Sequence, residues 1–207
     1  LWLRMRPTFK TAERLLLLSF LAGRFSLLKQ WWGIAYGHDA GFQMEVSRKV
    51  TLFGPRLGLH ECFNCYQPPL GFLFPKWLME LTGVTETSAA QLVGFLFSLW
   101  AFGAFRGVLK HLGLLHRPMG MALLYLSMTM PVMQYLAYGI TLDSQMLFYA
   151  SAVLWLSTKA FWPRNPAVPA SPRVKWAGMV ALVITLAASP MVKYSGFLLF
   201  ALPGMVA

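Results

Sequence analysis

Carboxylates are scarce in this chain. Only seven of its 207 residues are Asp or Glu, against eighteen Lys and Arg, while 57% are hydrophobic and the mean hydropathy is +0.55. A bilayer makes carboxylates expensive, so this composition indicates a membrane protein and argues against an ordinary soluble domain. Six of the seven acids fall in segments that we expect on one face of the membrane: Asp39, Glu45, Glu61, Glu80, Glu86 and Asp143. Their gathering there indicates a polar working site at that face.

Several motifs of well-known enzyme classes are also missing. The sequence contains no phosphate-binding glycine loop, no dinucleotide fingerprint, no zinc-protease helix and no G-x-S-x-G. Its net charge of +11 would suit nucleic-acid binding, but the basic residues lie mostly in short connectors between apolar stretches. That is the positive-inside pattern of membrane proteins, so we do not expect nucleic acid as a partner.

Apolar stretches dominate what is present. A membrane-crossing helix needs about 20 apolar residues, and five stretches come near that length, with a sixth that runs to the last residue. They are residues 15–36, 88–109, 118–138, 143–162, 176–192 and 195–207. The predicted fold is all-α, a polytopic membrane helical bundle. Because the chain stops inside an apolar stretch, we expect it to be the N-terminal part of a longer protein whose C-terminal part is missing.

The distribution of basic residues predicts the orientation. Residues 4–14 hold four basic side chains, so the N-terminus is expected in the cytoplasm and residues 37–87 form a loop on the outer side. Within that loop, residues 40–52 and 68–82 have the pattern of amphipathic helices that lie at the membrane surface. A span at 68–82 would turn the later basic connectors outward, which the charge rule disfavours.

Two aspartates stand beside the ends of apolar stretches on the expected outer side. Asp39 follows the first stretch, directly after His38, and Asp143 begins the fourth. Either acid is a good N-cap for the helix that follows it. Each is equally a carboxylate at the water–lipid boundary, where partial desolvation raises its basicity. Their occurrence at the same face favours a functional site.

Two basic side chains lie at or within the apolar stretches. Lys193 separates the last two stretches and is either a cation that binds phosphate or a lysine that snorkels at a helix end. In the second case Tyr194 is an ordinary interface aromatic. Arg24 lies well inside the first stretch. A charge there indicates function by default, and the alternative is a tilted helix from which Arg24 snorkels or pairs with a neighbour.

The outer loop holds both cysteines, in a C-x-x-C formed by Cys62 and Cys65 beside His60. Outside the cytoplasm a disulfide is plausible, and we rank a disulfide or inert thiols first. A metal site that includes His60 is weakly indicated, because only one cysteine pair is present. A redox motif is least favoured, since no βαβ pattern surrounds the pair.

Four short segments complete the pattern. An acid just after the first apolar helix is followed by a Pro-Pro-Leu element, an Asp at a later helix exit and a Lys-Tyr-x-Gly break. The segments are His38-Asp39-Ala40, Tyr66-Gln67-Pro68-Pro69-Leu70, Thr141-Leu142-Asp143-Ser144 and Val192-Lys193-Tyr194-Ser195-Gly196. In order and spacing this series resembles the GT-C-type membrane glycosyltransferases, which include the protein O-mannosyltransferases and the aminoarabinose transferase of lipid A. The resemblance covers nearly the whole chain.

The resemblance implies that residues 1–207 are the N-terminal part of one transmembrane catalytic domain. Its implied activity is an inverting transfer of a sugar from a polyprenyl-phosphate donor to an acceptor hydroxyl outside the cytoplasm. The acceptor is a lipid, a glycan or a protein. The implied location is the bacterial inner membrane or the endoplasmic reticulum, as a multi-pass protein in contact with membrane lipids.

Carried over to this chain, the resemblance gives roles to particular residues. Asp39 would be the base that deprotonates the acceptor hydroxyl. Asp143 would shape the site or bind a divalent cation. Lys193, with Arg24 behind it, would bind the donor phosphate, because the lipid-phosphate leaving group needs positive charge nearby. The residues that would shape the site are His38, Tyr66, Gln67, Pro68 and Tyr194.

The chain departs from the family at two places. Family members often have Asp-Glu where this chain has Asp39-Ala40, and often have His or Glu-Lys before the proline where this chain has Gln67-Pro68. These departures argue against a metal bound by the loop. Two other functions stay open: a polytopic transporter or lipid flippase, and a non-catalytic relative of the transferases.

Overall fold

The computed structural model describes residues 2–35, 40–50, 68–129, 142–161 and 172–206 of the chain. These residues form helices and no strand, so the predicted all-α class is confirmed. The helices are α1 (Trp2–Trp31), α2 (Ala40–Lys49), α3 (Leu70–Thr82), α4 (Glu86–His111), α5 (Pro118–Thr129), α7 (Asp143–Phe161), α8 (Pro172–Val192), the 3-10 helix η1 (Tyr194–Phe200) and α9 (Ala201–Val206).

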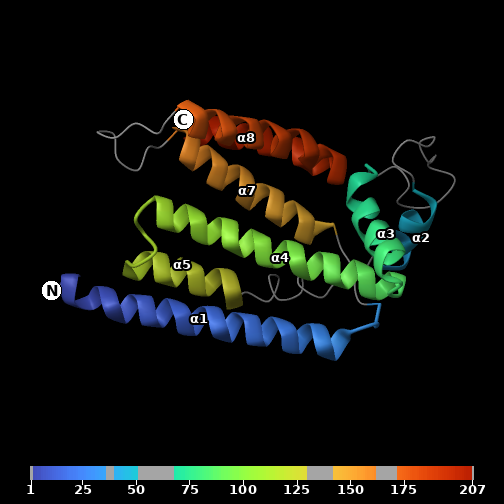
Figure 1. Cartoon of the computed structure of the whole chain (residues 1–207), viewed down its shortest axis with the longest axis horizontal. Coiled ribbons are helices and arrows are strands. Elements are labelled where there is room, and N and C mark those ends of the chain that lie inside the picture. The colour runs from blue at the N-terminus through green and yellow to red at the C-terminus, as the bar shows by residue number, and fades with distance from the viewer. Residues whose placement is uncertain (1, 36–39, 51–67, 130–141, 162–171, 207) are drawn as a thin grey trace.

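The long helices lie side by side, with α4 and α7 between α1 on one side and α8 on the other (Figure 1). Successive long helices run in opposite directions. The end of α1, the starts of α4 and α7 and the end of α8 therefore meet at one end of the molecule, where α2 and α3 also lie (Figure 1). This end carries all the sequence segments that were expected together on the outer side and that the structure describes.

Local sequence signals fix the ends of α4. Thr85 is its N-cap and accepts a hydrogen bond from the Ser88 amide at 3.3 Å. Glu86 in the first turn and Lys110 in the last turn both complement the helix dipole. Gly113 then adopts a positive φ of 70° and its amide bonds the Lys110 carbonyl at 3.2 Å, which ends the helix.

Three clusters of buried apolar side chains hold the helices together. The largest joins α4, α7, α8 and η1, and its members include Phe97, Val153 and Val192. A second, around Phe20 and Leu124, joins α1, α4 and α5. The third joins α2 and α3 to the residue that precedes α7, through Val46, Val50, Phe72, Leu73 and Leu142.

Ion pairs and hydrogen bonds add to the packing of the two short helices. Arg48 of α2 donates to Glu86 at the start of α4 at 2.7 Å. Lys76 of α3 donates to the Val50 carbonyl just past α2 at 2.8 Å. The short helices α2 and α3 correspond to the predicted amphipathic segments 40–52 and 68–82. In Figure 1, α3 runs across the ends of the long helices rather than alongside them.

The predicted spans correspond to helices, with shifted ends. Among the residues that the structure describes, α4 is the helix that is long and apolar enough to cross a membrane, and a buried core helix of a soluble protein meets the same test. Shorter apolar helices cover Pro118–Ser127, Trp176–Val192 and Ser195–Met205. Residues 195–207 are expected as one helical span, but the described part forms η1 followed by α9. The multi-pass arrangement stays a prediction.

Candidate ion-pair site at the meeting of three helices

An ion pair joins two of the predicted site residues. Asp143 lies in the first turn of α7, where a carboxylate is favoured by the helix dipole. Its Oδ1 accepts a hydrogen bond from Lys193 Nζ at 2.6 Å. The two side chains are 52% and 32% exposed, so the pair is open to solvent on one side and accessible to a ligand.

Helix α3 lies close to the two backbone segments that carry Asp143 and Lys193. Gly71 lies in the first turn of α3, against Leu142 and Val192. A Cβ at Gly71 would come 2.6 Å from Leu142 Cδ2 and 3.2 Å from Val192 Cγ1. Leu142 and Val192 directly precede Asp143 and Lys193 in the chain. The absence of a side chain at Gly71 therefore lets α3 contact the two segments that carry the ion pair.

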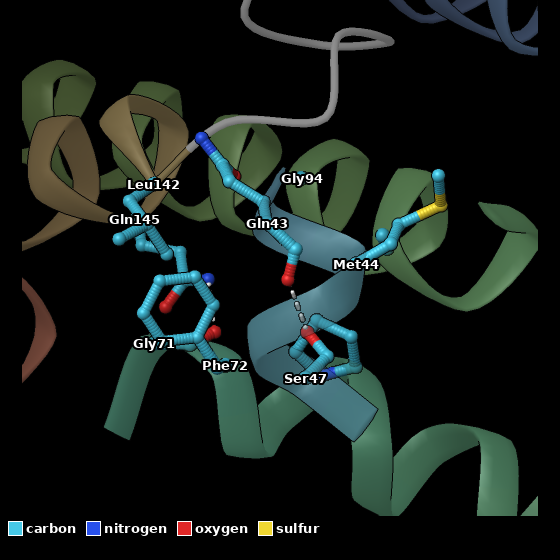
Figure 2. Close-up of a pocket in the computed structure, with 10 residues that line it drawn as sticks. Gln43, Met44, Ser47, Gly71, Phe72, Gly94, Leu142 and Gln145 are labelled. Atoms are coloured by element: carbon cyan, nitrogen blue, oxygen red, sulfur yellow. Dashed lines mark hydrogen bonds between the residues drawn. The ribbon is translucent and has the colours of Figure 1, made fainter. Parts of the chain in front are cut away.

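Gln145 ties α7 to the same point of α3. Its Nε2 donates a hydrogen bond to the Gly71 carbonyl at 2.8 Å, in a fully buried contact. Its Oε1 is buried with no hydrogen-bond partner among the described residues and lines a cleft of about 20 Å³. Figure 2 shows the residues that line this cleft, with Gln43, Met44 and Ser47 on α2 and Gly71 and Gln145 on the neighbouring helices α3 and α7. A volume of this size holds about one water molecule.

The backbone of Lys193 breaks the chain between α8 and η1. Its φ of −154° and ψ of 141° are extended, and it serves as the N-cap of η1. Ser189, one turn before the end of α8, donates its hydroxyl to the Gly196 carbonyl at 3.1 Å. A Cβ at Gly196 would lie 2.6 Å from Pro190 N and closer still to the Ser189 carbonyl group. The break therefore holds Lys193 between two helices that lie tightly against each other.

The structure brings together three of the four segments that carry the resemblance. These are the described part of the second segment, residues 68–70, of which Pro68 is buried and which Gly71 follows directly, the start of α7, and the break at Lys193. Residue Ala40 of the first segment is buried at the start of α2, which packs on α3. Seven predicted residues lie outside the described part of the chain: His38, Asp39, His60, Cys62, Cys65, Tyr66 and Gln67. The side chain of Tyr194 is likewise not described, and the roles of all these residues stay predictions.

Arg24 lies elsewhere. It lines a cavity with Phe20 of its own helix, Ser98 of α4 and Leu147 and Ser151 of α7. Neither Asp143 nor Lys193 is among the described residues that line this cavity. The structure therefore does not join Arg24 to the ion pair.

Sequence reasoning missed a second charged cluster. Glu13 is buried, and it accepts hydrogen bonds from Arg106 Nε at 2.6 Å and faces His116 Nε2 at 2.9 Å. Burial alone would raise the pKa of Glu13, but the bonds and charges of His116 and Arg106 outweigh it and lower the pKa below its ordinary value of 4.5. The sequence did hold a signal for this cluster, because Glu13 is the one acid outside the predicted outer face.

Gln91 was also missed. It is fully buried in α4, where it accepts from the Gly33 amide at 2.9 Å and donates to the carbonyls of Trp31 and Ile34 at 2.7 and 2.9 Å. Together with the Glu13–Arg106 pair it fastens α1 to α4 at two places, at residue 13 within α1 and at its C-terminal end. A lone amide in an apolar stretch is the sequence signal for such a contact.

Among the described residues, no group of three or more His, Cys, Asp or Glu side chains could hold a metal ion. Comparison with protein-family models, with curated proteins and with solved structures found no match. The chemistry of the site must therefore be argued from its own geometry.

Proposed function

We propose that this chain is part of an integral membrane glycosyltransferase that moves a sugar from a polyprenyl-phosphate donor to an acceptor hydroxyl. The observation that carries the proposal is the contact between Lys193 and Asp143, at 2.6 Å, where α3, α7 and α8 meet. A cation that is about one-third exposed and is held in place by a carboxylate is suited to bind the phosphate of a lipid donor.

The exposed apolar side chains support a membrane location. Each of six large apolar residues on α1, α8 and η1 is more than half exposed: Leu15, Leu18, Phe25, Val183, Ile184 and Leu198. Exposed apolar surface of this extent typically marks contact with lipid or with another protein. On α1 the exposed residues recur at three- and seven-residue spacing, as a lipid-facing stripe does. We propose contact with membrane lipids, either in the bacterial inner membrane or in the endoplasmic reticulum.

The proposed reaction is a single displacement. The acceptor hydroxyl oxygen attacks the anomeric carbon and gives its proton to Asp39, while the bond from that carbon to the phosphate oxygen breaks. The polyprenyl phosphate leaves with the bonding electrons, and Lys193 neutralises part of its charge. Attack opposite the leaving group inverts the anomeric centre. Asp143 holds the Lys193 ammonium in position, and a divalent cation beside Asp143 stays part of the proposal.

The test is sugar transfer in membranes that contain the full-length protein. We expect Lys193→Met to lower transfer about 100-fold, the effect of removing one group that stabilises a developing charge. Glu45 and Lys49 provide a matched control, because they form a similar exposed ion pair at 2.8 Å on α2. Lys49→Met should transfer sugar at the wild-type rate. Wild-type transfer by Lys193→Met would refute the proposed role.

A charge swap separates a chemical role from a structural one. The double variant Asp143→Lys with Lys193→Asp keeps the ion pair but moves the cation to α7. We expect its stability to fall by no more than about 1 kcal/mol, because a lysine at the start of α7 opposes the helix dipole, while transfer stays lost. Recovery of transfer in the swap would mean that the pair serves structure alone. Unchanged transfer by Asp39→Asn would remove Asp39 from the chemistry.

One observation favours a transporter or flippase as the second candidate. Arg24 is a charged side chain buried within the layer of long helices, and transporters commonly place charged groups at such depth. Uptake of a lipid-phosphate sugar into sealed vesicles, with no product formed, would favour this candidate over the transferase.

A further inference from the structure

Arg24 is a buried charge, and no acidic side chain of the described residues pairs with it or lines its cavity. Its residue is 2% exposed, and Nε and Nη1 have no hydrogen-bond partner in the part of the chain that the structure describes. The ring of Phe20 lies 4.7 Å from Arg24 Cζ and covers one face of the guanidinium. A ring face does not accept the in-plane N–H donors, and an uncompensated buried charge is costly. The fold therefore holds an unsatisfied cation.

This cation opens into a cavity of about 190 Å³ between α1, α4, α5 and α7. The walls are mainly aromatic and aliphatic, and no described acidic residue lines them. Ser98 and Ser127 also line it, but their hydroxyls donate to the carbonyls of Phe95 and Leu124 in their own helices. Arg24 thus gives an otherwise apolar cavity one positive charge. The remaining described lining residues are Phe20, Ala101, Phe102, Phe105, Leu147 and Ser151.

Size and charge together define the occupant. A cavity of about 150 Å³ in another protein holds benzene, so this one accommodates a six-membered ring, or a short alkyl chain, together with a small polar group. One guanidinium without an acid nearby matches a single negative charge. A carboxylate provides that charge and accepts short, charge-assisted hydrogen bonds from arginine.

We propose that this cavity binds a monocarboxylate with a compact apolar body, such as benzoate, hexanoate or the carboxylate end of a fatty acid. The apolar body fills the space beside Phe20 and Phe102, and the carboxylate accepts hydrogen bonds from the Arg24 guanidinium, through Nε or through Nη1. The site is separate from the Asp143–Lys193 pair and does not depend on sugar transfer, so either proposal can fail alone.

The experiment measures ligand binding to the purified full-length protein in detergent, by the shift of its thermal midpoint and by calorimetric titration. Benzoate and hexanoate represent free acids, and laurate represents a membrane fatty acid. Toluene and benzylamine supply similar apolar bodies without the negative charge. We expect the acids to raise the midpoint as their concentration increases, since a ligand that binds the folded state stabilises it. Toluene and benzylamine should shift it far less.

Two variants test the site itself. Arg24→Met removes the charge at similar volume and should weaken benzoate binding by about tenfold or more, because hydrogen bonds to charged groups are strong. Ala101→Leu keeps Arg24 but fills the cavity, so it should abolish binding. This variant also tests the site if Arg24→Met does not fold. Arg48→Met is the matched control, because Arg48 is an exposed arginine on α2, and it should bind as wild type does.

Each outcome decides the proposal. Binding of benzoate or of laurate that depends on Arg24 and on an open cavity supports it, and the preferred acid identifies a free or a membrane source. Equal binding of toluene and benzoate, equal affinity in wild type and Arg24→Met, or absence of binding by all three acids would overturn it.

Discussion

Replacing Gly196 by alanine should open the junction between α8 and η1. The new Cβ would lie 2.6 Å from Pro190 N and nearer still to the Ser189 carbonyl carbon and oxygen. These are backbone atoms at the end of α8, so they cannot move aside by changing a rotamer. The clash would also stretch the hydrogen bond from the Ser189 hydroxyl to the Gly196 carbonyl, which is 3.1 Å long.

The expected cost follows from these contacts. Overpacking a tight site costs typically 1–3 kcal/mol, and a clash with backbone belongs at the upper end. The gain from replacing glycine in a helix offsets up to about 1 kcal/mol. We therefore expect a loss of about 2–3 kcal/mol, which corresponds to a fall of roughly 4–12 °C in the thermal midpoint of a chain of this length.

The assay is thermal unfolding followed by circular dichroism at a fixed scan rate, with hydrogen exchange as a local readout. The amides of Lys193 and Gly196 are bonded to the carbonyls of Ser189 and Lys193, and both should exchange faster in Gly196→Ala. Gly178→Ala is the matched control, because Gly178 lies in α8 with nothing within 4 Å of the added Cβ. An unchanged midpoint and unchanged exchange in Gly196→Ala would refute the close contact.

The other contacts give shorter predictions. Gln91→Leu should lower the free energy of unfolding by about 1–3 kcal/mol and speed exchange of the Gly33 amide, since a hydrogen-bonded polar group is lost from a buried site; an unchanged exchange rate would contradict the contact. Because the pKa of Glu13 in the folded protein lies below its ordinary value of 4.5, the ionised side chain stabilises the fold at pH values above 4.5, and this stability is lost as the pH falls through the folded-state pKa. Between about pH 6 and about pH 3, the free energy of unfolding from chemical denaturation should therefore fall more in wild type than in Glu13→Gln. Equal falls in the two proteins would argue against the cluster. Lys193→Met should lower the free energy of unfolding by less than about 1 kcal/mol, because the ion pair is partly exposed. A loss above this value would assign the pair a structural role.

Much of the helix pattern follows from the sequence. Apolar stretches predict α4, α7 and α8 to within a few residues, because hydrophobic length is a local property. Successive antiparallel helices also bring every second connection to the same end, which is why Asp143 and Lys193 could be expected near each other. The start of α1 at Trp2 could not be read in this way, since residues 4–14 hold four basic side chains and hydropathy gives no helix signal there.

Details of packing depend on directions that local sequence does not encode. Gly103 and Gly107 share the spacing of a helix-packing motif and both predict close contact. Only Gly107 shows it, because an added Cβ would lie 2.6 Å from Trp155 Nε1, whereas one at Gly103 meets nothing within 4 Å. The two glycines lie on the same face of α4, one turn apart, and the difference is that the Trp155 side chain reaches the backbone at Gly107 alone.

The same limitation explains why Arg24 was predicted to bind the donor phosphate together with Lys193, whereas the structure places Arg24 in a different cavity. Its depth in the first apolar stretch could be read from the sequence, but the helix it faces could not. The contact of Gln145 with Gly71 joins residues 74 positions apart and depends on how α3 crosses the ends of the long helices. Crossing angles arise from the packing of whole helix surfaces, and no short motif specifies them.

The three hydrogen bonds of Gln91 also bear on biosynthesis. Their partners at the end of α1 precede Gln91 by 57 to 60 residues. After α1 has been translated, the ribosome must add nearly sixty further residues before Gln91 exists. During this time α1 lacks these three hydrogen bonds, whether it lies in the exit tunnel or in the machinery that receives the chain. Helix α1 is thus made well before α4 and gains these hydrogen bonds only once α4 has been made.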